Sequence, residues 1–96
     1  MVYKIILSLR TQNEIEKSID YYALHSADAP INFIDSLKEA YDKLSVNPFE
    51  RLRYKKIRVL QLERFPFALY FTIDTTTNTV KILSCFHNKR NPDKRP

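Results

Sequence analysis

Two groups of cations and one histidine in the second half of the chain are the residues best suited to chemistry. The first group falls within one short stretch and comprises Arg51, Arg53, Lys55, Lys56 and Arg58. The second group closes the chain and comprises Lys89, Arg90, Lys94 and Arg95. If both groups meet on one face, they form a surface for nucleic acid or an acidic partner. Solvated surface charge accounts for the same pattern equally well.

The histidine, His87, lies two residues before the second group. An imidazole with an unperturbed pKa near 6.5 can transfer protons at neutral pH. A histidine that hydrogen-bonds backbone at the end of a strand is the alternative. Tyr54 and Phe65 flank the first group and could stack on bases, but packing at the edge of a core is favoured for both.

Charge is divided unevenly along the chain. The net charge is +5, yet residues 1–50 hold five Lys/Arg against eight Asp/Glu, whereas residues 51–96 hold eleven against three. The two halves therefore carry −3 and +8. This asymmetry points to an anionic or acidic partner for the second half.

Composition excludes several classes of protein. The 96 residues contain no glycine, so glycine-rich phosphate-binding loops cannot form and we expect no cofactor. A chain of this length is expected to form one domain over 1–96. The single cysteine, Cys85, indicates a reducing compartment, and with His25 and His87 it matches no zinc spacing. No segment approaches the roughly 20 apolar residues of a membrane span, so a cytoplasmic protein with no membrane partner is expected.

The first half predicts a strand followed by two helices. Residues 2–8 are rich in β-branched and aromatic types, which favours a strand. Thr11 and Glu14 have the spacing of a capping box, which predicts a helix from there to about His25. Ser26 or Asp28 can cap a second helix. That helix should end at Asn47-Pro48 and bury Phe33, Leu37, Ala40, Tyr41 and Leu44.

The second half predicts three strands. Residues 57–62, 67–73 and 79–86 have strand patterns and are joined by short polar links, which is typical of an antiparallel meander. The basic residues before them are expected to form a loop. The predicted fold is α+β in the order β-α-α-β-β-β, with an antiparallel helical hairpin covering one face of the sheet. Residues 91–96 are expected to be a flexible tail.

Several motifs, taken in order, resemble one family. They are Tyr21-Tyr22 in the first helix, Asn47-Pro48 after the second, RFPFALYF at 64–71, which leads into the strand over 67–73, and the closing HNKRNP. Together they resemble the RelE/ParE superfamily of bacterial toxins, the plasmid stabilisation family, over nearly the whole chain. The resemblance implies the toxin of a type II toxin–antitoxin pair, which inhibits growth and is neutralised by a cognate antitoxin.

The superfamily has two branches with different targets. RelE-like toxins are ribosome-dependent ribonucleases that cut mRNA, and ParE-like toxins poison DNA gyrase. In the ribonucleases an arginine commonly occupies the third strand, where this chain has Ala68 or an apolar neighbour. The His-x-x-Arg pattern from His87 to Arg90 looks more like the ParE side. The resemblance therefore favours a ParE-like toxin, with a degenerate, non-toxic member as a further alternative.

Each branch implies different roles for the basic residues. A ribonuclease needs proton transfer and cations that stabilise a phosphorane, which His87, Arg58 and Arg90 could supply. A toxin that acts by binding would use a broader set of cations for its target. That set comprises Arg51, Arg53, Lys55, Lys56, Lys89, Lys94 and Arg95. A homodimer is also possible, since a sheet edge or helical groove left free by the antitoxin can pair with itself.

Overall fold

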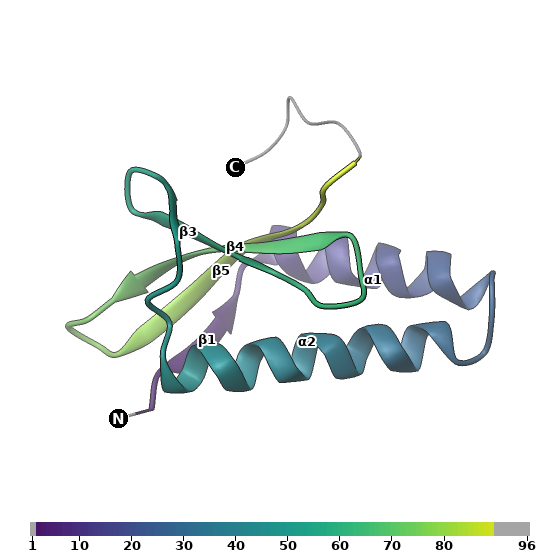
Figure 1. The fold of residues 1–96 in the computed structure, drawn as a ribbon, viewed down its shortest axis with the longest axis horizontal. Coiled ribbons are helices and arrows are strands. Elements are labelled where there is room, and N and C mark those ends of the chain that lie inside the picture. The colour runs from purple at the N-terminus through teal and green to yellow at the C-terminus, as the bar shows by residue number, and fades with distance from the viewer. Residues whose placement is uncertain (1, 90–96) are drawn as a thin grey trace.

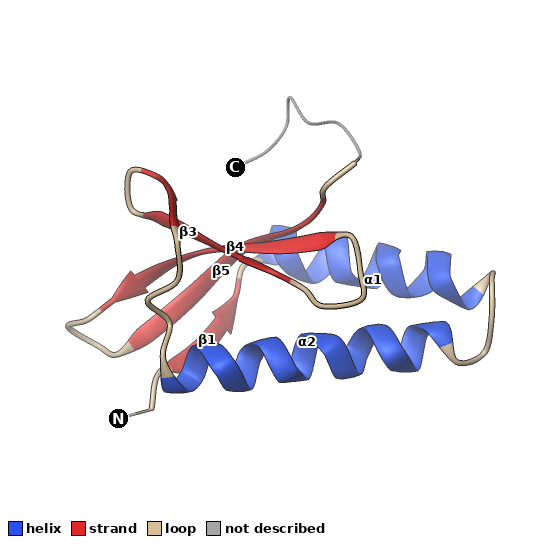
Figure 2. Cartoon of the chain, in the orientation of Figure 1, coloured by secondary structure: helices blue, strands red, loops and turns tan. Residues whose placement is uncertain are grey.

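Two helices lie on one face of a five-stranded sheet in the computed structural model, which describes residues 2–89 (Figure 1). The helices are α1 (Leu9–Ala23) and α2 (Ala29–Val46). The strands are β1 (Lys4–Leu7), β2 (Leu52–Tyr54), β3 (Ile57–Gln61), β4 (Phe67–Asp74) and β5 (Thr79–His87). Figure 2 shows the helices side by side as an antiparallel pair. The predicted α+β class and helical hairpin are therefore confirmed.

The strands form a mixed sheet in the order β1-β5-β4-β3-β2. β3, β4 and β5 pair antiparallel, as the predicted meander requires. β1 is parallel to β5, with Ile5 opposite Val80, so the N-terminal strand lies beside the last one. The sequence patterns did not assign a partner to β1.

The expected basic loop before β3 is partly a strand, and that prediction is wrong. β2 pairs antiparallel with β3, with Leu52 opposite Arg58 and Tyr54 opposite Ile57. The charged composition of this segment did not indicate a strand, because cations are typical of loops but are also common on an exposed edge strand. All three β2 residues are exposed.

The predicted capping box is also wrong, because α1 begins three residues earlier. Its N-cap is Ser8, whose Oγ accepts a hydrogen bond from the Thr11 amide at 3.1 Å. Thr11 is fully buried, and its hydroxyl donates to the Ile82 carbonyl at 2.9 Å. The Ser/Thr pair thus caps the helix and ties it to β5.

Glu14 continues this link between α1 and β5. β1 pairs with β5 only as far as Ile82, and the described part of the chain supplies no other strand along the rest of that edge. The Glu14 Oε1 accepts hydrogen bonds from the Ser84 hydroxyl at 2.8 Å and from the Cys85 amide at 3.1 Å. Beyond the end of β1, side chains of α1 therefore supply the hydrogen-bonding partners that β5 would otherwise find in a neighbouring strand.

Replacing Glu14 with alanine is expected to lower the free energy of unfolding by about 1–3 kcal/mol. The change leaves the Ser84 hydroxyl and the Cys85 amide without their acceptor in a part-buried site. Urea unfolding followed by circular dichroism measures the effect. Glu16→Ala, on the exposed side of the same helix, is the matched control. Equal losses in both variants would contradict the proposed link.

The second helix follows the prediction closely. Asp28 is the N-cap, Pro30 lies in the first turn, and the Ser26 hydroxyl accepts from the Ala29 amide at 2.9 Å. The helix ends at its C-cap, Asn47. Pro at the start needs no amide donor, which explains why it is tolerated there.

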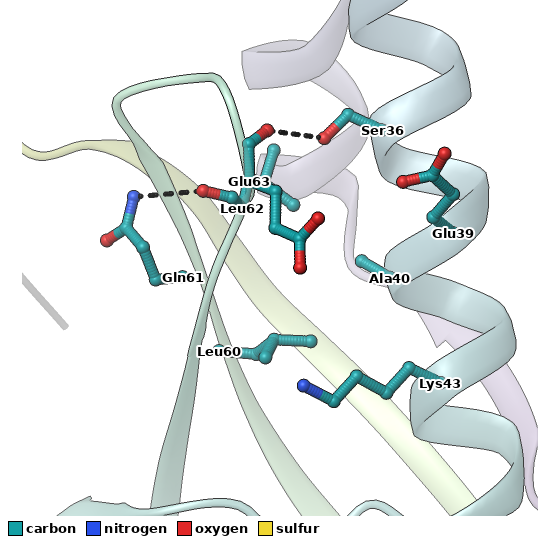
Figure 3. Close-up of a pocket in the computed structure, with 8 residues that line it drawn as sticks. All are labelled: Ser36, Glu39, Ala40, Lys43, Leu60, Gln61, Leu62 and Glu63. Atoms are coloured by element: carbon teal, nitrogen blue, oxygen red, sulfur yellow. Dashed lines mark hydrogen bonds between the residues drawn. The ribbon is translucent and has the colours of Figure 1, made fainter.

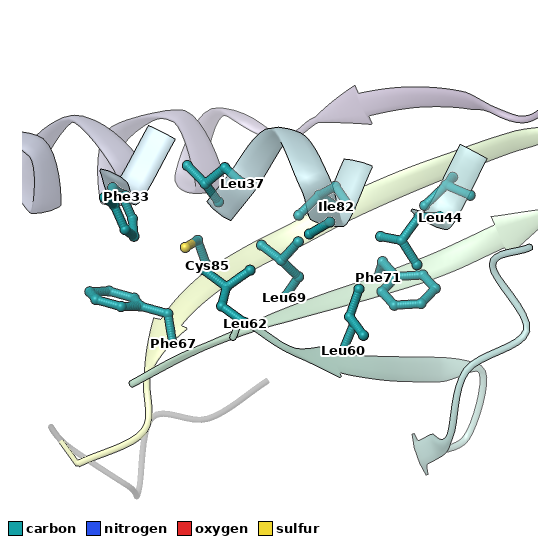
Figure 4. Packing of buried hydrophobic residues seen from close by; sticks show 12 residues of the cluster. Phe33, Leu37, Leu44, Leu60, Leu62, Phe67, Leu69, Phe71, Ile82 and Cys85 are labelled. Atoms are coloured by element: carbon teal, nitrogen blue, oxygen red, sulfur yellow. The ribbon is translucent and has the colours of Figure 1, made fainter. Parts of the chain in front are cut away.

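Apolar side chains of α2 pack against β3, β4 and β5 (Figure 4). The fully buried side chains of this core are Phe33, Leu44, Leu69, Phe71, Val80 and Ile82. The predicted buried face of α2 is confirmed, with Tyr41 only partly buried. Phe65 packs on this core, as expected. Tyr54 does not, because its β2 position leaves it 60% exposed.

The opposite face of the sheet has no helix among residues 2–89. Strand alternation places a smaller apolar cluster there, made of Ala68, Tyr70 and Phe86 with Ile57 and Val59 beside it. We call this the open face. Its apolar centre gives the sheet a second surface on which a ligand could be held.

Candidate functional site

The hairpin of β2 and β3 presents the first group of cations. Arg51, Arg53, Lys55 and Lys56 are all exposed, and the last two form the turn. Lys55 has φ 51°, in the left-handed region that costs a non-glycine residue roughly 1 kcal/mol. Its ammonium lies 5.3 Å from the centre of the Tyr54 ring. The hairpin thus holds four cations outward.

A groove of about 370 Å³ on the open face begins at these cations. It is lined by Arg51, Leu52, Arg53, Val59, Gln61, Ala68, Tyr70 and Asn88. Arg51 and Arg53 give it positive charge. Val59, Ala68 and Tyr70 belong to or pack on the apolar cluster of the open face. A groove of this composition can bind an anionic group together with a flat apolar one.

Two amide side chains close the groove and were missed by sequence reasoning. Gln61 Nε2 donates to the Phe67 carbonyl at 2.8 Å, and Asn88 Nδ2 donates to Gln61 Oε1 at 2.7 Å. This chain of hydrogen bonds joins β3, β4 and the residue after β5. For Gln61 a signal existed, since it alternates in phase with Val59 and so shares its face. Asn88 carried no such signal.

His87 lies on the helix-covered face and not in this groove. It is paired with Phe67, a core residue, and the two ring centres are 5.0 Å apart. A separate hollow of about 270 Å³ adjoins it, with Glu14 and Lys17 among its lining residues. The amide of the exposed Lys89 donates to His87 Nδ1 at 3.2 Å. The structure therefore separates His87 from Arg51 and Arg53.

Arg58 lies two strands away from His87 and is displaced from it along the sheet. One guanidinium nitrogen donates to the Glu50 carbonyl at 2.7 Å, and the group lies 5.3 Å from the centre of the Phe49 ring. On β4, Arg58 is opposite Phe71 and His87 is opposite Phe67. Those partners are four residues apart, which is about 13 Å along the strand. Arg58 holds the segment before β2 in place.

The predicted site residues are thus brought together only in part. The structure gathers Arg51, Arg53, Lys55 and Lys56 on one hairpin and leaves His87 and Arg58 apart. Arg90, Lys94 and Arg95 lie outside the described residues. The catalytic and target-binding roles of all these residues remain predictions.

A family comparison decides what kind of protein carries this site. The model of the family described as "ParE toxin of type II toxin-antitoxin system, parDE" matches residues 5–92. The chain belongs to this family. The match spans both helices, all five strands and the first cation group. The predicted RelE/ParE membership and its ParE-like branch are confirmed. No curated protein sequence matches this ParE-family chain significantly.

Solved structures confirm the fold of this ParE-family chain. The chromosomal ParDE toxin–antitoxin system from P. aeruginosa superposes with a TM-score of 0.74 at 16% identity, covering 90% of this chain and 96% of that one. The RelBE2 complex from Mycobacterium tuberculosis gives 0.65 at 19%, covering 91% and 99%. A free E. coli RelE mutant gives 0.68 at 14%, covering 96% and 90%. At identities this low, the three superpositions establish a common fold and nothing more.

A small pocket between α2 and β3 is distinct from the open-face groove. It measures about 80 Å³ and is lined by Ser36, Glu39, Ala40, Lys43, Leu60, Gln61, Leu62 and Glu63 (Figure 3). The Ser36 hydroxyl donates to the Glu63 carbonyl at 3.0 Å, which joins the helix to the end of β3. None of the predicted site cations lines this pocket. It is too small for a sizeable ligand.

Residues 2–89 hold no cluster of three or more histidine, cysteine or carboxylate side chains suited to a metal, and no helix there is long and apolar enough to cross a membrane. Cys85 is buried and unpaired, as expected of a small core side chain. Burial, and secondarily Glu14, raise the pKa of the Cys85 thiol from 9.0 to about 12. Burial likewise raises the pKa of Tyr41.

The Cys85 thiol of this ParE-family toxin is expected to resist modification in the folded state. The folded protein holds the thiol proton more tightly than the unfolded chain. The contribution of Cys85 to the free energy of unfolding is therefore complete below pH 9, and it declines as the pH rises from 9 to about 12. Ellman's reagent should label the chain rapidly in urea and at least 100-fold more slowly without it. Fast labelling of the native protein at pH 8 would contradict the buried placement.

Proposed function

We propose that this ParE-family toxin inhibits an essential cytoplasmic target of bacteria, such as DNA gyrase, by binding it, and that a cognate antitoxin neutralises it. The contact surface is the β2–β3 hairpin with the open-face groove, extended by Lys89 and the predicted tail cations Lys94 and Arg95. The observation that carries the proposal is the position of Arg51 and Arg53 on an otherwise apolar and amide-lined groove.

The composition of the groove supports binding over cleavage. Among the described residues that line it there is no histidine, carboxylate or lysine, and Tyr70 is the side chain there that could transfer a proton. Guanidinium groups, amides and a phenol bind anionic or polar surfaces without needing to accept a proton. A target can therefore be held there without being cut.

The order in which cellular syntheses fail tests the proposal. The toxin is induced without antitoxin, and the incorporation of labelled thymidine and labelled methionine is followed over the first minutes. DNA synthesis should fail first, and the purified toxin should inhibit gyrase-dependent supercoiling. Protein synthesis failing first, with fragmented mRNA, would instead establish a ribosome-dependent ribonuclease. If neither DNA synthesis nor protein synthesis fails, the protein is a degenerate, non-toxic member of the family. Each of these two results would overturn the proposal.

His87→Ala separates binding from RNA cleavage at the level of one side chain. Because His87 lies on the helix-covered face, its removal is expected to change toxicity by less than about threefold. A proton-transfer role for His87 in a ribonuclease would make the loss about 10²- to 10⁴-fold. Growth after induction, with the protein level matched by immunoblot, measures the difference. A loss of that size would favour the set His87, Arg58 and Arg90.

A further inference from the structure

The tip of the helical hairpin is acidic and partly apolar. Residues 18–37, which contain the turn between α1 and α2, include three Asp and no Lys or Arg. Leu24 is 85% exposed at the end of α1, and Ile31 is 58% exposed in the first turn of α2. Exposed apolar side chains gathered within a single-sign rim are typical of a contact surface. We call residues 18–37 the acidic tip.

The β2 end of the molecule has the opposite charge and a similar apolar character. Residues 51–58 include five cations and no carboxylate. Leu52 and Tyr54 are each more than half exposed, and so is Phe49 just before them. β2 is also the last strand of the sheet, so no strand from residues 2–89 lies along its outer edge. We call residues 49–58 the basic edge.

The two surfaces cannot meet within one molecule. Figure 1 shows the turn between α1 and α2 at one end of the molecule and the β2–β3 hairpin toward the other. The acidic tip carries −3, and the basic edge, which includes Glu50, carries +4, so two tips repel each other and two edges repel each other. Only the contact between one tip and another molecule's edge combines opposite charge with exposed apolar surface.

We propose that the acidic tip of one copy of this toxin docks on the basic edge of a second copy. The contact is heterologous, because different surfaces of the two copies meet, so each pair still has one free tip and one free edge. Assemblies therefore lengthen as concentration rises. The surfaces are small, which places the contact among weak interfaces, with a dissociation constant on the order of 10–100 µM.

Self-association of this kind covers Arg51 and Arg53. These are the cations that the proposed function assigns to the target, so free toxin masks its own target surface as it accumulates. Only this consequence rests on the proposed function. The association itself involves the toxin alone and can be measured without any target.

Sedimentation of the purified full-length toxin tests the contact. In 50 mM salt the average mass should rise with concentration, and in 500 mM salt it should fall to that of the monomer, because salt screens exposed charges. A tip variant, Asp20→Asn with Leu24→Ser, should remain monomeric. An edge variant, Arg51→Gln with Arg53→Gln, should remain monomeric as well.

Mixing the two variants gives the decisive result. The intact tip of the edge variant meets the intact edge of the tip variant, so the mixture should form pairs and nothing longer. The control, Leu9→Ser with Glu16→Gln, makes the same types of change on the N-terminal half of α1 and should associate like the natural sequence. A natural toxin that stays monomeric at 500 µM, or a mixture that stays monomeric, would overturn the proposal. Association that survives in either single variant would do the same.

Discussion

Replacing Arg51 and Arg53 together with glutamine is expected to reduce toxicity by about 10²- to 10⁴-fold. Both guanidinium groups line the open-face groove, and within residues 2–89 neither takes part in an ion pair. Each charge-assisted hydrogen bond to a target contributes about 1.5–3 kcal/mol, and 1.4 kcal/mol corresponds to a factor of ten. The inducer concentration that halves bacterial growth measures the change.

A matched pair of substitutions separates this loss from a general effect of charge. Lys38→Gln with Lys43→Gln removes two cations from α2, on the far side of the sheet from the groove, and should leave toxicity within about twofold. Circular dichroism must show that both double variants are folded. Undiminished toxicity in the arginine variant would refute the target surface proposed for the groove.

Replacing Phe71 with alanine is expected to remove about 3–5 kcal/mol from the free energy of unfolding. Phe71 is fully buried on β4, the central strand of the sheet, and its loss leaves a cavity between the sheet and α2. A chain of 96 residues has a total stability of roughly 5–14 kcal/mol. Much of the stability is therefore lost, and urea denaturation should show a much lower midpoint.

Phe49→Ala is the control for this loss, because it removes the same atoms from a side chain that is 53% exposed. Within residues 2–89, the aromatic interactions of Phe49 are a T-shaped contact with the Tyr3 ring and a contact with the Arg58 guanidinium. Its removal should cost about 1 kcal/mol. Equal losses for the two phenylalanines would mean that the core assigned to β4 is misplaced.

Much of the fold could be predicted because its signals are local. The apolar spacing of Phe33, Leu37 and Leu44 predicts the buried face of α2 without any tertiary information, and the structure confirms it. The parallel pairing of β1 with β5 could not be predicted, since no local pattern specifies a partner 75 residues away. The helix cap failed for a related reason, because the Thr11 hydroxyl and Glu14 Oε1 bond to β5 and do not cap the start of their own helix.

The site was less predictable than the fold. The cations of the β2–β3 hairpin are evident as a run of charge, but Gln61 and Asn88 meet only when β3 and the end of β5 lie on either side of β4. For His87 and Arg58, the residue types were evident but the distance between them was not. Register along β4 places their partners four residues apart, and β4 itself lies between their strands. Side-chain roles that depend on register require the paired strands to be known.

The parallel pairing of β1 with β5 also determines when the protein can become active during its synthesis. β1 and the polar side chains of α1 bond to β5, so these segments must wait for a strand that is synthesised about 75 residues later. At bacterial rates of 5–20 residues per second, that interval is roughly 4–15 s. Asn88 joins the groove only at the end of the same interval. A chain that stops before residue 79, as when a message is broken or a codon stalls, is therefore expected to be harmless to the cell that makes it.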